Sequence, residues 1–199
     1  MKHQVIEFLS DTDLDNLLEE ANKIREQHWG KTITYSRKVF VPLTNMCRNT
    51  CSYCTFVKDP DSDEATILTK DQVIDIIKEG QKQGCKEVLF SLGEKPELRY
   101  PIARRALKRL GFNSMVDYLK EVCQLTLQMS NLIPHVNAGT LSLEDIKKLK
   151  PVTASMGMML ETTSKRLTRK GQPHYACPDK VPIQRIRTLQ RAGTMKVPF

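Results

Sequence analysis

Short apolar runs alternate with helix-like segments along most of this chain, and no other feature constrains its fold as strongly. The strand-like runs lie at residues 38–43, 86–91, 132–136 and 152–160. The helix-like segments lie between or after them, at residues 69–84, 102–110, 114–129, 142–151 and 180–191. Strands that alternate with helices form parallel sheets whose connections are crossover helices. The sequence therefore predicts the α/β class.

The two ends of the chain are interpreted separately. Residues 1–30 are expected to form a leader helix, ahead of a core domain at residues 31–199. Apolar residues recur in the leader at helical spacing, at Leu14, Leu17, Leu18, Ala21 and Ile24. At the other end, residues 195–199 are interpreted as the start of a fifth strand. We therefore expect the sheet to continue beyond Phe199, and an unpaired edge of this kind promotes association.

The composition argues against a membrane or secreted protein. No stretch reaches the roughly 18 consecutive apolar residues of a membrane span. Residues 1–30 also lack the apolar region of a secretory signal, so we expect a cytoplasmic protein. In a reducing cytosol, clustered thiols bind metal more often than they form disulfides.

The chain has a formal net charge of +8, and its densest basic stretch is short. Its members are Arg99, Arg104, Arg105, Lys108 and Arg109. These side chains fall largely on one side of a predicted helix, which is more often a solvated face than a phosphate-binding surface. Aromatic residues make up only 6% of the chain, so few platforms exist for base stacking. The charge leaves RNA open without favouring it, and an anionic small molecule would benefit from the same field.

Three of the six cysteines are packed into one loop, at Cys47, Cys51 and Cys54, with the spacing C-x3-C-x2-C. Thiolates are soft ligands that suit iron–sulfur clusters, zinc or Cu(I). A structural zinc site needs a fourth ligand at short spacing, and the nearest candidates, His28 and Cys85, are distant. Three cysteines leave one iron of a four-iron cluster open for a substrate. The pattern favours this cluster over zinc, a ferredoxin-type carrier or chance clustering.

The three remaining cysteines are scattered. Cys85, Cys123 and Cys177 are interpreted as small buried hydrophobic residues that do not bind the cluster.

The cysteine loop, with an aromatic residue at Tyr53 and a strand before it, resembles the signature of the radical S-adenosylmethionine superfamily. The resemblance implies an incomplete parallel (β/α) barrel, the first four to five strands of six. It also implies that the open iron binds S-adenosylmethionine, from which one electron releases methionine and a 5′-deoxyadenosyl radical. Tyr53 would lie near the adenine, although ordinary loop packing explains an aromatic residue there equally well.

Two further segments match positions that bind S-adenosylmethionine in this superfamily. Gly93 and Glu94 resemble the end of a Gly-Gly-Glu element, whose first glycine is replaced by Leu92. Glu161, at the end of the fourth predicted strand, resembles a polar contact to the same molecule. The alternative for Gly93 and Glu94 is a common turn after a strand. The alternative for Glu161 is an acidic residue in the first turn of a helix, where the helix dipole favours a negative charge. His135 and Asn137 end the third predicted strand and are candidates to face the substrate.

Five segments together resemble a narrower family, the 7,8-didemethyl-8-hydroxy-5-deazariboflavin synthases of the first-subunit (CofG) type. They lie at residues 37–45, 91–97, 134–139, 156–164 and 174–180. The resemblance implies a lyase of coenzyme F-420 biosynthesis that acts on 5-amino-5-(4-hydroxybenzyl)-6-(D-ribitylimino)-5,6-dihydrouracil. Hydrogen abstraction, ring closure and loss of ammonia would give the deazaflavin. A second synthase subunit (CofH type) would supply the substrate, and a reductant protein would supply the electron.

Two other interpretations stay open. One is a different radical enzyme, of the futalosine, biotin or tRNA-modifying type. The other is a metal-binding module without catalytic activity.

Overall fold

The computed structural model describes residues 13–199 and divides the chain into two units, residues 1–35 and residues 36–199. The first unit contains helix α2 (Leu14–Trp29), none of whose residues is buried. Gly30 ends the helix with a positive φ of 62°, and its N–H donates to the carbonyl of Glu26. The first twelve residues of the predicted leader lie outside the described residues.

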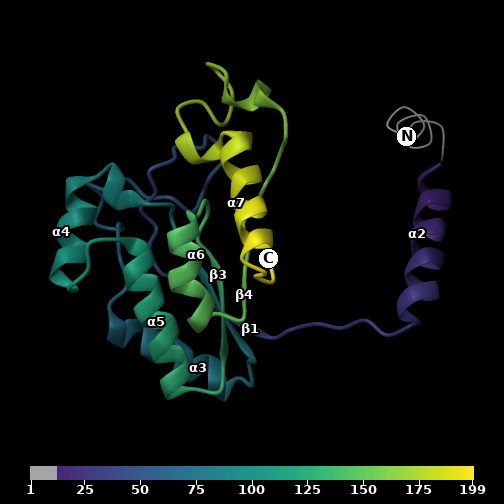
Figure 1. Cartoon of the computed structure of the whole chain (residues 1–199), viewed down its shortest axis with the longest axis horizontal. Coiled ribbons are helices and arrows are strands. Elements are labelled where there is room, and N and C mark those ends of the chain that lie inside the picture. Colours follow the sequence, from purple (N-terminus) through teal and green to yellow (C-terminus); the bar gives the residue numbers. More distant parts are fainter. Residues whose placement is uncertain (1–12) are drawn as a thin grey trace. The chain divides into compact units, whose positions relative to one another are not determined.

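The second unit contains a sheet of four parallel strands (Figure 1). The strands are β1 (Lys38–Pro42), β2 (Glu87–Ser91), β3 (Ile133–Asn137) and β4 (Ser155–Met156). They lie in the order β1-β2-β3-β4, so each strand pairs with its neighbour in the sequence. A parallel sheet that is wound in one direction has the topology of a barrel. The predicted α/β class and incomplete parallel barrel are confirmed.

The helices of this unit form one layer. They are α3 (Lys70–Lys82), α4 (Pro101–Arg109), α5 (Met115–Met129), α6 (Leu143–Leu149) and α7 (Pro182–Thr194). Contacts join α3 to α5, α5 to α6 and α6 to α7, and Figure 1 shows α5, α6 and α7 side by side. Short 3-10 turns lie at Pro96–Leu98, Lys150–Val152, Lys165–Thr168 and Pro178–Lys180. None of the helices in residues 13–199 has the length and apolarity that a membrane crossing requires.

Alternate residues of the strands face the helix layer and form the apolar core. Val41, Val88, Phe90 and Val136 are fully buried there, against helix residues that include Leu119. The residues between them face the opposite side of the sheet, where Phe40 and Ile133 are 49% and 48% exposed. Because strand side chains alternate between faces, the two faces of the sheet have different environments.

The fourth predicted strand is much shorter than expected. Only Ser155–Met156 of residues 152–160 pairs with β3, and residues 195–199 form no strand. The two segments still meet, since the Met156 N–H donates to the Pro198 carbonyl at 2.9 Å. A parallel strand extends only as far as neighbouring strands supply hydrogen bonds. On its outer side β4 has the one bond to Pro198 within residues 13–199, and it therefore stays short.

Candidate functional site

Four segments meet at the edge of the sheet where the strands end. The cysteine loop follows β1, Gly93 and Glu94 follow β2, Gly139 and Thr140 follow β3, and Gly157 follows β4. Carboxyl ends of parallel strands lie at one edge, where barrel enzymes place their active sites. A cavity of about 160 Å3 lies at this edge. Its lining includes Cys47, Cys51, Cys54, Tyr53, Gly93, Glu94, Asn137, Met159, Lys180 and Arg185.

Backbone hydrogen bonds fix the start of the cysteine loop against the segment after β2. The Gly93 N–H donates to the Thr44 carbonyl at 2.8 Å, and the Arg48 N–H donates to the Glu94 carbonyl at 2.9 Å. A Cβ at Gly93 would overlap the carbonyl group of Met46. The position therefore requires glycine, whereas Leu92, which replaces the first glycine of the motif, packs against the apolar core.

The three loop thiols line the same cavity with different exposure. Cys47 is buried, Cys51 is half-buried and Cys54 is exposed. The Glu94 N–H donates to the Cys47 sulfur at 3.1 Å, a contact that would also stabilise a thiolate. Burial raises the pKa of Cys47, and burial with the nearby Cys177 raises the pKa of Cys51 to about 12. The free thiols of Cys47 and Cys51 are thus protonated, and metal binding must release those protons.

The arrangement of ligating side chains does not suit a single metal ion. Within residues 13–199, no three His, Cys, Asp or Glu side chains form a group that could hold one metal ion. What the loop cysteines share is the cavity that they line.

The scattered cysteines differ from one another. Cys123 is fully buried in the apolar core and Cys85 packs against it. Cys177 is also buried, but its sulfur lies 3.8 Å from the Cys51 sulfur and accepts the Thr50 N–H at 3.3 Å. Cys177 therefore packs directly against the cysteine loop, a position that its sequence context did not indicate.

A buried polar network lies behind the cysteine loop. Its members are Arg48, Asn49, Glu94, Thr140, Asp179 and Arg185. The Asn49 amide donates to both Glu94 and Asp179 at 3.2 Å, and it accepts the Asp179 N–H at 3.1 Å. The Arg48 guanidinium pairs with Asp179 through two nitrogens. Thr140 donates its N–H to Glu94 at 2.5 Å.

The two acids of this network have opposite pKa shifts. Burial, together with the negative charge of Asp179, raises the pKa of Glu94 above its ordinary value. Burial also acts to raise the pKa of Asp179, but the hydrogen bond and charge of Arg48 outweigh it and lower that pKa. The Arg185 guanidinium lies 3.6 Å from the Glu94 carboxylate. The cavity wall thus places a carboxylate and a guanidinium side by side.

A second polar group surrounds Tyr53 at the mouth of the cavity. The Tyr53 hydroxyl donates to Glu161 at 3.0 Å and lies 2.8 Å from Nε2 of His174. Glu161 also pairs with Lys180, and its backbone has a positive φ of 65°. His174 is 2% exposed, and its Nδ1 has no hydrogen-bond partner among residues 13–199. Burial lowers the pKa of His174, so its ring is neutral at neutral pH.

The two residues predicted to face the substrate lie on the sheet face opposite the helices. Asn137 lines the cavity. His135 lies one layer deeper, in register with Leu89 and Ser155, and its Nδ1 is 2.5 Å from the Ser155 hydroxyl. Burial and the charge of Lys38 lower the pKa of His135.

The structure thus brings together the loop cysteines, Tyr53, Gly93, Glu94 and Asn137 around one cavity. Glu161 reaches it through Tyr53, and His135 lies below it. The sequence interpretation missed Asn49, His174, Asp179, Lys180 and Arg185 as site residues. One signal was available, because residues 174–180 match the synthase family, but no residue there stood out by type.

Comparison with protein families gives one match, to the Radical SAM superfamily over residues 41–195. Among relatives, an FO synthase of Nocardia farcinica is 47% identical over 197 residues, which is 94% of this chain and 23% of that protein. A 7,8-didemethyl-8-hydroxy-5-deazariboflavin synthase of Methanopyrus kandleri is 42% identical over 167 residues, 84% of this chain and 50% of that protein. The chain therefore spans 23% of the length of the first relative and 50% of the length of the second.

Two solved structures share the fold at low identity. The FeFe-hydrogenase maturase HydG of Carboxydothermus hydrogenoformans has a TM-score of 0.73 and 24% identity, over 96% of this chain and 41% of HydG. Methylornithine synthase (PylB) has a TM-score of 0.67 and 17% identity, over 98% of this chain and 52% of PylB. These likenesses show the architecture of residues 36–199 and leave its reaction to the site residues.

Proposed function

Since the chain belongs to the Radical SAM superfamily, we propose that residues 31–199 form the core of a radical S-adenosylmethionine lyase that makes a deazaflavin. The observation that carries the proposal is the cavity in which three loop thiols meet Glu94 and Arg185. The names of the FO synthase and deazariboflavin synthase relatives support the choice of reaction.

Cys47, Cys51 and Cys54 would hold a [4Fe-4S] cluster. They are free thiols on one cavity wall, and Cys47 already accepts a backbone hydrogen bond that favours a thiolate. The donor set therefore fits a cluster with one iron left open. When bound, the cluster supplies the electron that splits S-adenosylmethionine into methionine and a 5′-deoxyadenosyl radical.

The charged pair beside the thiols suits the methionine end of S-adenosylmethionine. Glu94 would accept hydrogen bonds from its ammonium group, and Arg185 would bind its carboxylate. Both side chains are buried, which strengthens these contacts because water does not compete. Gly93 allows the close approach that brings Glu94 to this position.

Tyr53 and Glu161 would bind the adenosine end. The Tyr53 ring is 54% exposed at the cavity and is free to stack on adenine. Its hydroxyl is held by Glu161 and His174, so the ring orientation is fixed before the ligand arrives. The second oxygen of the Glu161 carboxylate pairs with the Lys180 ammonium group, and the carboxylate could accept a hydrogen bond from a ribose hydroxyl.

The substrate would lie below the adenosine, on the open sheet face. Asn137 at the cavity and His135 beneath it offer hydrogen bonds, and Phe40 and Leu89 offer apolar contact in the same layer as His135. We propose that these four side chains bind the hydroxybenzyl dihydrouracil adduct. The adduct would then lose a hydrogen atom to the radical, close its ring and release ammonia. A second synthase subunit would supply the adduct, and a reductant protein would supply the electron. The six free thiols suit the reducing cytoplasm.

The test uses the full chain, reconstituted anaerobically with iron and sulfide and then reduced with dithionite, which supplies the electron. We expect an electron paramagnetic resonance signal that changes when S-adenosylmethionine is added, and deoxyadenosine and fluorescent deazaflavin once the adduct is supplied. A Cys51→Ala variant should lose the signal and all turnover. Cleavage of S-adenosylmethionine without deazaflavin would contradict the substrate and favour another radical enzyme. Bound zinc, or a cluster that ignores S-adenosylmethionine, would contradict enzyme chemistry and leave a metal-binding module.

A further inference from the structure

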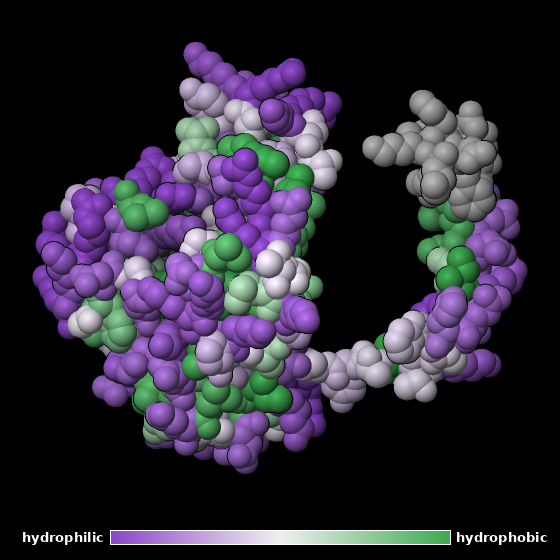
Figure 2. Space-filling model, in the orientation of Figure 1, coloured by the Kyte–Doolittle hydropathy of each residue, from purple (hydrophilic) through white to green (hydrophobic). Residues whose placement is uncertain are grey.

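The basic stretch singled out in the sequence has an unusual position in the structure. Its five cations, Arg99, Arg104, Arg105, Lys108 and Arg109, are all exposed on or just before α4, and we call this surface the α4 basic face. No acidic residue lies between Leu98 and Asn113. Figure 2 shows a mostly hydrophilic surface over α4, at the left of the view.

The cations of the α4 basic face have no ion-pair partner within residues 13–199, unlike four of the five lysines on α3 and α6. None of the five forms an ion pair with a carboxylate within residues 13–199. By contrast, Lys70 of α3 pairs with Glu121 at 2.6 Å, and Lys148 of α6 pairs with Asp117 at 2.6 Å. Unpaired cations leave a positive field that can attract an acidic partner.

The α4 basic face adjoins the outer side of the cysteine loop. Arg99 donates to the carbonyl of Arg48, between the first two cysteines, at 2.7 Å. A surface depression is lined both by Thr50 of the loop and by Tyr100 and Arg105. Asp59 and Asp61 also line this depression, whereas α4 itself (Pro101–Arg109) contains no acidic residue. The loop thus has its thiols toward the cavity and its backbone toward the basic surface.

We infer that the α4 basic face is the docking surface for a small acidic electron-transfer protein that carries an exposed flavin or iron–sulfur cofactor. The inference rests on the proposed function, which requires one electron per turnover from outside the cavity. S-adenosylmethionine and substrate would occupy the cavity side, so the electron has to enter through the outer side of the loop. A nine-residue helix is about 14 Å long, which suits the small interfaces of transient electron-transfer complexes.

RNA is the rival partner for a basic surface, and the local aromatic residues disfavour it. Tyr100 is the aromatic residue closest to α4 in sequence, and the Arg99 guanidinium lies 5.2 Å from its ring centroid. One face of the ring therefore lies against a cation, and α4 itself (Pro101–Arg109) contains no aromatic residue on which a base could stack.

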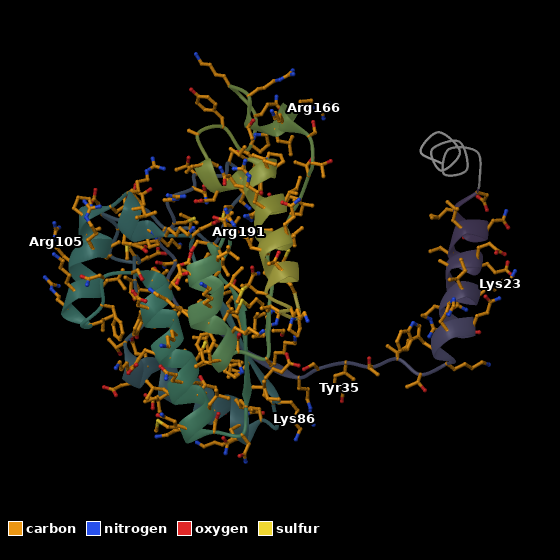
Figure 3. The ribbon with its side chains drawn as sticks, in the orientation of Figure 1. Lys23, Tyr35, Lys86, Arg105, Arg166 and Arg191 are labelled. Carbon is orange, nitrogen blue, oxygen red and sulfur yellow. The ribbon has the colours of Figure 1, made fainter. Side chains whose placement is uncertain are left out.

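The experiment measures the rate at which reduced flavodoxin, a small acidic flavoprotein, reduces the cluster in the full chain. The test variant carries Arg105→Gln, Lys108→Gln and Arg109→Gln, which leave the Arg99 bond to the loop intact. The matched control carries Lys78→Gln, Lys82→Gln and Lys86→Gln, which remove three exposed charges near the amino end of β2. Figure 3 shows Arg105 and Lys86 at separate parts of the second unit.

We expect the test variant to be reduced by flavodoxin about tenfold more slowly at low salt, a typical size for lost electrostatic steering. The control should stay within about twofold, and the wild-type rate should fall as salt rises. Reduction by dithionite, a small chemical reductant, should be the same in all three proteins. Equal flavodoxin rates in the test and control variants would overturn the inference.

Three further measurements separate the possible failures. Flavodoxin binding to the chain without its cluster, measured by calorimetry, should weaken in the test variant even if the cluster cannot be loaded; unchanged binding would overturn the inference. A cluster that dithionite reduces but that ignores S-adenosylmethionine would contradict the proposed function without touching the docking result. If a single-stranded RNA oligonucleotide bound in place of flavodoxin, and only the RNA binding needed α4, the surface would be an RNA site and the inference would be wrong.

Discussion

The apolar core and the polar network are both buried, yet they are built on different principles. In the core, Val41, Val88 and Phe90 are fully buried by contacts that need shape but little direction. In the network, Glu94 and Asp179 are 5% and 3% exposed and depend on particular hydrogen bonds. The core holds the sheet to its helices, whereas the network holds the cysteine loop to the strand ends. Stability should therefore follow the core, and cofactor binding should follow the network.

The largest effect is expected in the core. Phe90→Ala should lower the free energy of unfolding by about 3–5 kcal/mol, because it removes a fully buried ring and leaves a cavity. The matched variant, Phe40→Ala, removes the same ring from the opposite face, where Phe40 is 49% exposed, and should cost less than about 1.5 kcal/mol. Urea unfolding measures both, and equal losses would show that the two faces are equally packed.

The next effect concerns the junction between the two regions. Gly93→Ala should destabilise the protein by about 1–3 kcal/mol, since the new Cβ meets the rigid backbone of Met46. It should also lower the iron bound per chain, because the loop start has to move. Gly193→Ala in α7 is the control, since its new Cβ would have no atom of residues 13–199 within 4 Å beyond its chain neighbours and its own helix backbone, and it should stabilise slightly. Full iron content in the Gly93 variant would show that the loop tolerates the shift.

A smaller effect is expected from the network. Asp179→Asn should cost about 1–2 kcal/mol, because the charged bond to Arg48 is lost while repulsion with Glu94 is relieved. The folded-state pKa of Asp179 is lowered, so its stabilisation is complete above the unfolded pKa of about 4 and disappears as pH falls below it. The difference in melting temperature between the two proteins should therefore shrink at acidic pH. A difference that is independent of pH would contradict this role for the charge.

The smallest change in stability is expected at His174. His174→Phe removes the contacts with Tyr53 and Glu161, which is a cost, and removes a buried Nδ1 without a partner among residues 13–199, which is a gain. The two effects should nearly cancel, within about 1 kcal/mol. The affinity for S-adenosylmethionine should nevertheless fall about threefold to tenfold, because Tyr53 is no longer oriented. Calorimetric titration measures this, with Tyr175→Phe, at a half-exposed neighbour, as the control. Unchanged affinity would make His174 a packing residue.

The sequence predicted the core well because the core depends on local pattern. The apolar run at residues 86–91 predicted a strand, and β2 forms at Glu87–Ser91. The helix predicted at residues 69–84 forms as α3, which Thr69 and Gln72 begin with a capping box. The fourth strand failed for the opposite reason. Its length depends on whether a neighbour at Pro198 supplies hydrogen bonds, and the residues at 152–160 carry no information about that.

The same division applies to the site. The spacing of the cysteines and the ends of the strands predicted site residues that lie within short sequence motifs. These are the loop cysteines, Gly93 and Glu94, which the structure places around one cavity. Asp179 and Arg185 were missed because their partners lie far away in sequence, as in the bond between Asn49 and Asp179 across 130 residues. A polar pair of this separation leaves no periodic signal. Only the folded chain shows which charges neutralise one another.

The sequential strand order has a consequence for how the molecule assembles during synthesis. Each strand pairs with the one made just before it, so β1, β2 and β3 can dock in turn as the ribosome delivers them. The cysteine loop and Glu94 are then in contact before residue 100 is complete, through bonds that need only β1 and β2. Asp179 and Arg185 arrive some eighty residues later and close the back of the loop. In the nascent chain the cysteine loop is therefore positioned first, and the charged contacts of Asp179 and Arg185 behind it form last.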